Sequence, residues 1–185
     1  YTYPEATFTE GSYRTVRDAI SDIQDIEPGK EVTDSYFTLP PHPEAQGLEK
    51  ELRGRCLHNH ITTATRETAL SRFKALKAGE NFHDLSPELK TTYSNAERTQ
   101  NTIYMRLKYD EPSGTVVNVR KSMWIHPELD RAISIREAAR LQTFPDSFIF
   151  EGTKDSQYQQ VGNAVPPFLA KAVAESIISI LDQVQ

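Results

Sequence analysis

The C-terminal stretch PPFLAKAVAESIISILDQV (166–184) constrains the fold most strongly, because its apolar residues recur at helical spacing along one broad face. Pro166 and Pro167 suit the first turn of a helix, where a missing amide hydrogen removes no helical bond. The apolar positions are Phe168, Leu169, Ala172, Val173, Ile177, Ile180, Leu181 and Val184. A helix with so wide an apolar face needs a partner surface, so we expect it to pack on another part of the protein or on a second copy.

The residues before this helix favour a turn. Gly162-Asn163 is a turn dipeptide between two valines. Backbone N–H groups at the start of a helix point outward and attract anions, so we expect a carboxylate or a phosphate near residue 163.

Cap residues predict several helices upstream. Thr15 is followed three residues later by Asp18, and Ser134 by Glu137, which is the capping-box pattern at a helix start. Apolar residues at helical spacing predict a further helix over 64–76, and Ser86-Pro87 begins a short one. The helix from Ser134 must end before Pro145.

The remaining patterns predict strands and a boundary. β-branched residues over 57–65 indicate a short strand, and alternation on both sides of the turn EPSG predicts a hairpin over 102–119. The three prolines and one glycine of 36–48 mark a candidate linker.

The distribution of charge is uneven along the chain. The net charge is −5, but residues 51–140 carry 15 basic and 11 acidic side chains. A positive middle region between acidic flanks can present a basic surface to nucleic acid, or it can be an ordinary solvated surface. The basic residues that lie on the proposed hairpin or flank it could follow a phosphate backbone. Those residues are Arg98, Arg106, Lys108, Arg120 and Lys121.

Two other groups of residues could carry chemistry, and both favour structural roles. His58 and His60 would share one face of a strand, but no Asp, Glu or Cys cluster nearby completes a metal site, so we expect no metal. Cys56 has no identifiable base beside it and suits a partly buried structural thiol. A single cysteine excludes an internal disulfide and fits a reducing cytosol.

Two longer segments point to a family. RAISIREAARLQTFPDSFIF (131–150), followed by QQVGNAVPPFLAKAVA (159–174), closely resembles motifs IX and X of the DNA (cytosine-5) methyltransferases. Both motifs occur in order and at the family's spacing. The resemblance is looser upstream, where RLKYDEPSGTVVN (106–118) is similar to the segment that closes the family's target recognition domain. TVRDAISDI (15–23) is similar to the segment that follows motif VIII.

The resemblance implies roles for particular residues. Asn163, Ala164 and Val165 match the loop that lies against the S-adenosyl-L-methionine pocket. Thr115 and Val116 match the pair that approaches DNA beside the flipped cytosine. The motif IX arginines would brace the recognition domain as fixed donors; they are Arg131, Arg136 and Arg140.

The family's catalytic motifs are absent from these residues. There is no Pro-Cys nucleophile, no E-N-V segment, no F-x-G-x-G cofactor loop and no Q-x-R-x-R of motif VIII. We therefore expect the C-terminal part of a cytosine-5 methyltransferase, inactive alone, with S-adenosyl-L-methionine bound mainly by the missing N-terminal part. The alternatives are a free-standing DNA-binding remnant, one half of a split enzyme and, more distantly, a nuclease.

The expected fold class is α+β. A small mixed target recognition domain (39–128) would follow a catalytic-domain segment (1–38) and precede motifs IX and X (129–185), whose terminal helix belongs to a Rossmann-like methyltransferase domain. The expected partners are double-stranded DNA, the N-terminal catalytic part and, through the last helix, a second copy. The resemblance implies DNA methylation of the restriction-modification kind in a bacterial cytoplasm, and no run of about 18 apolar residues suggests a membrane.

Overall fold

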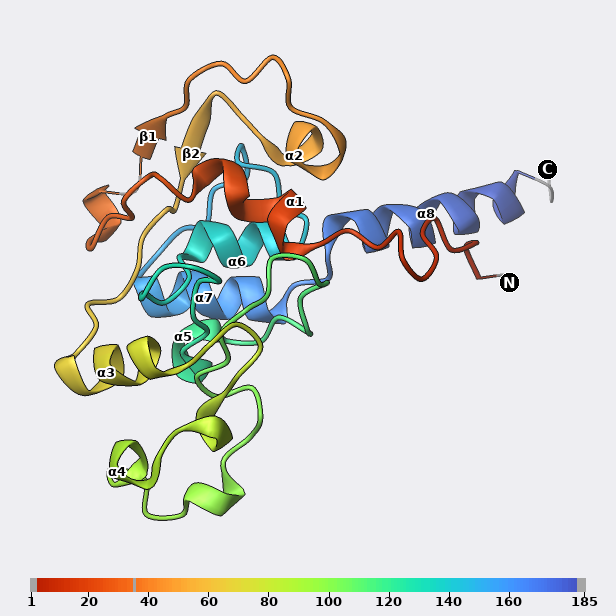
Figure 1. Cartoon of the computed structure of the whole chain (residues 1–185). Coiled ribbons are helices and arrows are strands. Elements are labelled where there is room, and N and C mark those ends of the chain that lie inside the picture. The colour runs from red at the N-terminus through yellow and green to blue at the C-terminus, as the bar shows by residue number, and fades with distance from the viewer. Residues whose placement is uncertain (1–2, 35, 183–185) are drawn as a thin grey trace.

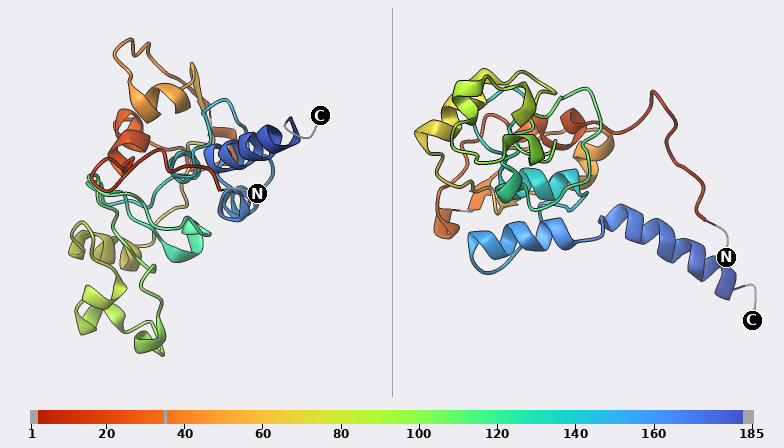
Figure 2. Two further views of the ribbon diagram at one scale, coloured as in Figure 1. Left: turned by 90° about the vertical axis from the view of Figure 1, so that its right-hand side faces the viewer. Right: turned by 90° about the horizontal axis from the view of Figure 1, so that it is seen from below.

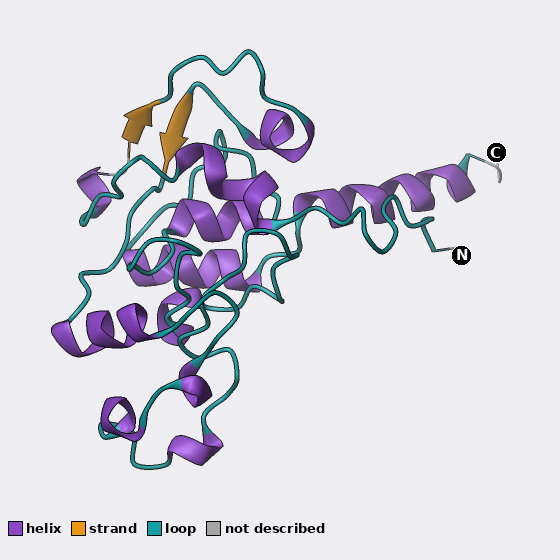
Figure 3. Ribbon diagram, in the orientation of Figure 1, coloured by secondary structure: helices purple, strands orange, loops and turns teal. Residues whose placement is uncertain are grey.

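The computed structural model describes residues 3–34 and 36–182. Most of this chain lies in loops, with short helices and one very small sheet between them (Figure 3). The helices α1, α2, α6 and α7 form the main body, α3 and α4 lie at one end of it, and α8 extends away from it (Figure 1). Two further views show the same projecting helix (Figure 2).

A stack of four helices holds the main core. α1 (Val16–Ile20) packs against α2 (Gly47–Leu52) and α6 (Ile135–Leu141), and α6 packs against α7 (Lys154–Asn163). The side chains of Ile20, Ile135 and Ala138 are fully buried in the core between them. Removal of such side chains from water is the main favourable contribution to folding.

The two predicted capping boxes begin α1 and α6. The Thr15 hydroxyl accepts from the Asp18 N–H, and the Asp18 carboxylate accepts from the Thr15 N–H. Ser134 and Glu137 make the same reciprocal pair, with Glu137 Oε2 accepting from the Ser134 N–H at 2.7 Å. These helix starts are therefore confirmed.

The sheet has two antiparallel strands, β1 (Tyr36–Thr38) and β2 (Cys56–His58). The strand predicted over 57–65 ends early because Asn59 adopts a left-handed backbone with φ of 61°. Asn59 leaves the ladder and instead bonds both backbone groups of Phe150, at 2.8 and 3.0 Å. The proline-rich candidate linker 36–48 holds β1 and the beginning of α2.

A smaller lobe holds α3 (Glu67–Ala75), α4 (Pro87–Lys90) and 3-10 turns at Phe82–Asp84 and Ala96–Arg98. Further 3-10 turns lie at Ser21–Ile23 and Val32–Asp34 in the N-terminal segment. The lobe has its own apolar cluster, in which the aromatic rings of Phe73, Phe82, Tyr93 and Tyr104 contact one another. Helices were predicted at α3 and α4, and both predictions are confirmed.

The predicted hairpin over 102–119 is wrong. Among the described residues, no ladder joins 102–109 to 115–119; Arg106 instead forms an isolated parallel bridge with Ile125. Residues 115–118 are irregular, and α5 (Val119–Ser122) begins where the second strand was expected. Val116 and Val119 both enter the main core, a three-residue spacing that alternation cannot provide.

The predicted turn at Gly162-Asn163 is also wrong, because α7 continues to Asn163. Gly162 is needed for a different reason. A Cβ at this position would lie 2.8 Å from the carbonyl carbon of Val117, so only glycine lets α7 approach the backbone of 117–118 so closely. The chain bends instead at 164–166, and α8 runs from Pro167–Leu181.

The last helix was correctly predicted, and its apolar face is largely exposed beyond Phe168, which packs partly against the main core. No residue of α8 is buried, and Leu169, Ile178 and Leu181 are each more than half exposed. Val184, counted in the predicted face, lies outside the described residues.

One described stretch, Lys154–Leu181, is long and apolar enough to cross a membrane by length and composition alone. It consists of α7 and α8 with a break between them, and α7 buries Tyr158 and Val161 in the core. α8 has 15 residues, which gives about 22 Å, short of the roughly 30 Å hydrocarbon layer. The broken geometry argues against a span.

Buried ion pairs connect the core helices to the loops around them. Arg140, fully buried, donates to both carboxylate oxygens of Asp146 at 2.8 and 2.6 Å, to the Ala19 carbonyl and to Asp22. Asp146 also accepts from the Gly54 N–H. Arg140 therefore joins α6 to the end of α1 and to two distant loops.

Arg136 and Arg131 extend this network. Arg136 donates to the carbonyl oxygens of His58, Pro145 and Phe148. Arg131 makes a two-pronged pair with Glu137, at 2.7 and 2.6 Å. Burial alone would raise the pKa of Glu137, but the charge and hydrogen bonds of Arg131 outweigh it and lower that pKa to about 2.

Two buried histidines lie around Glu137. His60 contacts Ser134 Oγ through Nδ1 and the Ile26 carbonyl through Nε2, each at 2.9 Å. His126 lies with Nε2 3.9 Å from Glu137 and accepts backbone N–H groups at Nδ1. Burial lowers the pKa of His126 to about 4, with Arg131 and Arg106 adding to the shift and Glu137 opposing it.

Replacing Arg140 with alanine tests the ion network. Arg140→Ala removes the two-pronged arginine partner of the buried Asp146 carboxylate and one of the two arginine partners of Asp22, so we expect the free energy of unfolding to fall by about 3–5 kcal/mol in urea denaturation. Arg98→Ala is the matched control, since Arg98 is exposed, and should change it by less than about 0.5 kcal/mol. A loss under about 1 kcal/mol for Arg140→Ala would contradict the idea that the stability of the fold depends on this buried ion network.

The histidines predict a pH dependence of stability. The folded-state pKa of His126 lies below its ordinary value of 6.5, so its contribution is complete above pH 6.5 and is lost as the pH falls toward 4. The lowered pKa of Glu137 extends the loss toward pH 2. His126→Gln should remove roughly 3 kcal/mol of the decline between pH 6.5 and 4. An unchanged urea-denaturation profile across that range would refute this assignment.

Candidate functional site

A surface hollow of about 440 Å³ brings three distant segments together, and we call it the junction hollow. It lies where α6 ends, where α7 passes to α8, and beside the irregular segment before α5. Its lining residues are Ser113, Gly114, Thr115, Val116, Leu141, Gln142, Gly162, Ala164, Pro166 and Leu169. The segment resembling motif X therefore borders the same hollow as the Thr115-Val116 pair.

Side-chain hydrogen bonds hold the walls of the junction hollow together. Gln142 donates to the Val161 carbonyl at 2.6 Å and so satisfies a carbonyl near the end of α7. The Asn118 amide donates to Gln159 Oε1 at 3.0 Å across the opposite wall. Because both bonds join segments far apart in sequence, the position of the α7 end is set by its neighbours on both sides.

The three predicted cofactor residues lie at this α7–α8 junction. Asn163 is exposed, and its side-chain oxygen accepts from Gln159 Nε2 at 2.7 Å. Val165 is 61% exposed, and Ala164 packs against the main core. A polar amide and an apolar side chain are thus both accessible at one bend of the chain.

The helix start at Pro167 offers fewer anion donors than the sequence suggests. Pro166 and Pro167 have no N–H, and the Phe168 N–H already donates to the Thr143 hydroxyl at 3.2 Å. The expectation that this terminus binds a carboxylate through several backbone N–H groups is therefore revised. The side chain of Asn163 is the better-placed polar group.

The predicted DNA-contacting residues do not form one surface. Arg106 is buried, and its guanidinium makes five hydrogen bonds to Leu76, His126, Leu129, Phe73 and Asp130. This use of all five donors leaves none for DNA. Val116 is also buried in the core. We correct the expectation for both and assign them structural positions.

The other four residues are accessible. Lys108 is exposed and pairs with Glu111 at 2.7 Å, and Thr115 is exposed at the rim of the junction hollow. Arg120 is partly exposed and contacts Asp155, and Lys121 is exposed one residue later on α5. Arg120 and Lys121 line a second hollow with Arg66, which the sequence analysis did not single out. The clustering of threonine and arginine over 62–68 was the available signal.

The three motif IX arginines lie inside the protein. Arg136 and Arg140 are fully buried, and Arg131 is largely covered. Their donors reach the loop carbonyls and carboxylates described above. Their hydrogen bonds therefore go to groups inside the protein and not to its surface.

The histidines and the cysteine considered for metal binding or thiol chemistry do not line the junction hollow. Among residues 3–34 and 36–182, no group of three or more His, Cys, Asp or Glu side chains could hold a metal ion. His60 is occupied by Ser134 and Ile26. Cys56 Sγ lies 3.0 Å from the Tyr36 hydroxyl.

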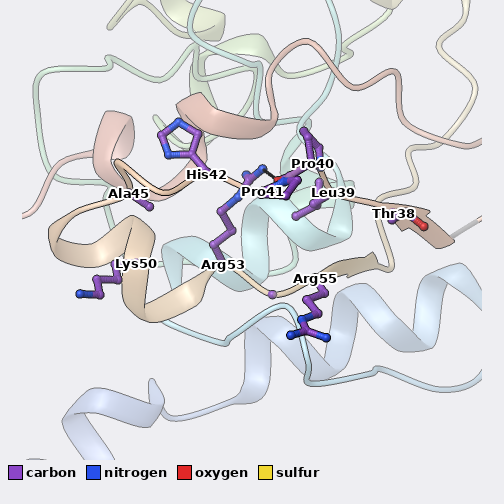
Figure 4. A pocket seen from close by; sticks show the side chains of 10 residues that line it. Thr38, Leu39, Pro40, Pro41, His42, Ala45, Lys50, Arg53 and Arg55 are labelled. Atoms are coloured by element: carbon purple, nitrogen blue, oxygen red, sulfur yellow. Dashed lines mark hydrogen bonds between the residues drawn. The ribbon is translucent and has the colours of Figure 1, made fainter.

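A further pocket, of about 580 Å³, lies between the 38–42 loop and α2. Arg53 extends toward Pro40 and donates to its carbonyl at 3.0 Å, whereas Lys50 and Arg55 point away from this contact (Figure 4). Arg53 also pairs with Asp22. These contacts make Arg53 a structural tie between α2 and the proline-rich loop.

Comparison with known proteins identifies a family that matches nearly the whole chain. The sequence model described as C-5 cytosine-specific DNA methylase matches residues 2–179. The chain is 35% identical to Type II methyltransferase M.DdeI of Desulfomicrobium norvegicum over 94% of this chain and 45% of that protein. It is 34% identical to Type II methyltransferase M1.HphI of Haemophilus parahaemolyticus, over 97% and 40% respectively.

A solved structure shares the fold. A prophage-encoded E. coli protein described as a DNA modification methyltransferase aligns with a TM-score of 0.68 at 24% identity, over 91% of this chain and 47% of that one. The chain spans less than half the length of these relatives. The family match covers nearly all of the chain, so the chain belongs to the C-5 cytosine-specific DNA methylase family.

Proposed function

We propose that this chain is the DNA-recognition and motif IX–X part of a DNA (cytosine-5)-methyltransferase. The parent enzyme would transfer a methyl group from S-adenosyl-L-methionine to C5 of a cytosine flipped out of a specific duplex. The observation that carries this proposal is the junction hollow. Ala164 and Thr115 both line this hollow. Ala164 belongs to the loop that resembles the family's cofactor-binding loop, and Thr115 to the pair that resembles the family's DNA-contacting pair.

The chemistry would require residues from an N-terminal catalytic part. A Pro-Cys thiolate attacks cytosine, and none is present in these 185 residues. S-adenosyl-L-methionine supplies the methyl group when bound, mainly through that N-terminal part. This chain would place Asn163, Ala164 and Val165 against the cofactor, and Thr115 beside the DNA.

The proposed division is 1–38 as the segment after motif VIII, 39–128 as the recognition domain and 129–185 as motifs IX and X. Buried contacts tie these three parts together. Arg140 of the third part bonds Asp22 of the first, and Asp146 bonds the Gly54 N–H of the second. A rigid mount of this kind would keep the DNA-facing segment in register with the cofactor-facing loop. Extrusion of a base costs a few kcal/mol, which well-placed contacts offset.

The exposed apolar face of α8 fits the same proposal. Leu169, Ile177, Ile178 and Leu181 are all exposed, and a patch of this kind marks a surface for another protein part. We propose that it packs on the catalytic part in the bacterial cytoplasm, where the DNA is. Pairing with a second copy through α8 is the alternative arrangement.

The first test is methyl transfer. We expect the chain alone to incorporate no labelled methyl group from S-adenosyl-L-methionine into duplex DNA, because it has no Pro-Cys nucleophile. The same chain covalently joined to its N-terminal catalytic part should be active. Incorporation by the isolated chain would contradict the proposal.

A mixing control separates the alternatives. Recovery of activity when the two separate parts are combined would identify one half of a split enzyme. DNA binding by the chain without any association would indicate a free-standing DNA-binding module instead.

The second test concerns the cofactor loop. Asn163→Ala in the full-length enzyme removes one exposed amide, so the Kd for S-adenosyl-L-methionine should rise about fivefold, equivalent to a hydrogen bond of about 1 kcal/mol. The Kd for DNA should change less than about twofold. Gln160→Ala is the control, because Gln160 lies on the same helix but bonds the Glu151 carbonyl. Equal cofactor affinity in Asn163→Ala and the parent would rule out this role.

A further inference from the structure

The second hollow, about 610 Å³ in volume, lies between the start of α3, the Tyr93 loop and α5, and we call it the α3–α5 hollow. Segments from four places along the chain line it. Its residues are Thr63, Ala64, Arg66, Thr68, Ala69, Arg72, Thr92, Tyr93, Tyr104, Arg120, Lys121 and Met123. Four of them are cationic and none is acidic, so the hollow has a positive lining.

Two of the four cations are already occupied. Arg72 is buried and donates to the Leu89 carbonyl, the Tyr104 hydroxyl and Thr92 Oγ1. Arg120 donates to Thr63 Oγ1 at 3.1 Å and contacts Asp155. These two side chains are therefore held in place by contacts within the protein.

The other two cations are available. Arg66 and Lys121 are exposed, and neither side chain forms a hydrogen bond or an ion pair with the described residues 3–34 and 36–182. They come from α5 and from the residue before α3, which are 55 positions apart in sequence. The fold therefore brings two uncompensated charges to one hollow.

The hydroxyl groups beside these cations indicate the kind of ligand. Thr63, Thr68 and Thr92 line the hollow, and no Asn, Gln, Asp or Glu does. Adenine is usually read by Asn or Gln and cytosine by an acidic side chain. Arg and Lys can read guanine, but cations set beside several hydroxyl groups also suit phosphate oxygens. The lining is thus chemically suited to a phosphate group.

We infer that the α3–α5 hollow holds a phosphate of the DNA backbone, with Arg66 and Lys121 as its two charge partners and the threonine hydroxyls as further donors. This inference rests on the proposed DNA-methylating function. The role is positioning and carries no base specificity.

The test uses the full-length enzyme and measures the Kd for a duplex containing its recognition sequence at several salt concentrations. Each cation that neutralises a phosphate adds about 0.9 to the salt slope. Arg66→Gln with Lys121→Gln should lower the slope by about 1.8, so the affinity lost between 50 and 200 mM salt shrinks about 12-fold. Lys74→Gln, an exposed cation on α3 outside the hollow, should leave the slope unchanged.

A second variant excludes misfolding as the cause. Thr68 is in the first turn of α3, where a carboxylate favours the helix. Thr68→Glu should weaken DNA binding without lowering Tm, because it places a negative charge in the hollow.

The outcomes separate the possibilities. Equal weakening on cognate and non-cognate duplexes with a smaller slope supports the phosphate clamp. An unchanged slope with relaxed sequence preference would show that these residues read bases, and wild-type behaviour of all variants would remove the hollow from the DNA surface. Failure of the parent enzyme to methylate DNA would overturn the proposed function itself, which is a separate readout.

Discussion

The rest of the structure depends on hydrogen bonds from buried arginine guanidinium groups to backbone carbonyls. The sheet consists of two strands of three residues each, and most of the chain is in loops (Figure 3), so many buried carbonyls have no ladder partner. Such groups must be paired elsewhere. Arg106 and Arg136 together donate to seven backbone carbonyls, most of them in loops or at the ends of helices and strands. The planar fork of arginine, with five fixed donors, lets one side chain hold several loops at once.

The same groups explain why segments distant in sequence behave as one unit. Asp22 accepts from both Arg53 and Arg140, and Asp146 accepts from Arg140 and the Gly54 N–H. Loss of one partner leaves a charge in the interior, which is far more costly than the net value of the pair. The candidate linker at 36–48 is therefore no free hinge: the β1–β2 ladder holds residues 36–38, Arg53 binds the Pro40 carbonyl, and α2 begins at Gly47.

Local signals in the sequence were sufficient where a few neighbouring residues decide the structure. The capping boxes at Thr15 and Ser134, and the apolar face of α8, depend on contacts within one or two turns of a helix. The hairpin over 102–119 failed because burial of Val116 and Val119 in a distant core overrode their alternation. α7 was missed because Gly162 was interpreted by conformation, whereas its reason is a close approach to Val117 that only the folded chain reveals.

The candidate site also has features that local sequence predicts and features that only the folded chain reveals. The distribution of charge is the clearest example. The excess of basic residues over 51–140 suggests a DNA-facing surface, yet Arg72, Arg106, Arg136 and Arg140 are buried in internal bonds. The count of basic residues therefore overstates the charge that DNA would meet. What distinguishes Arg66 and Lys121 is that no described residue pairs with either side chain, although both lie beside hydroxyl groups in one hollow, and no linear pattern encodes that. In a loop-rich protein stabilised by buried arginines, the positive surface available to DNA is defined by the exposed cations that have no partner, not by the overall number of basic residues.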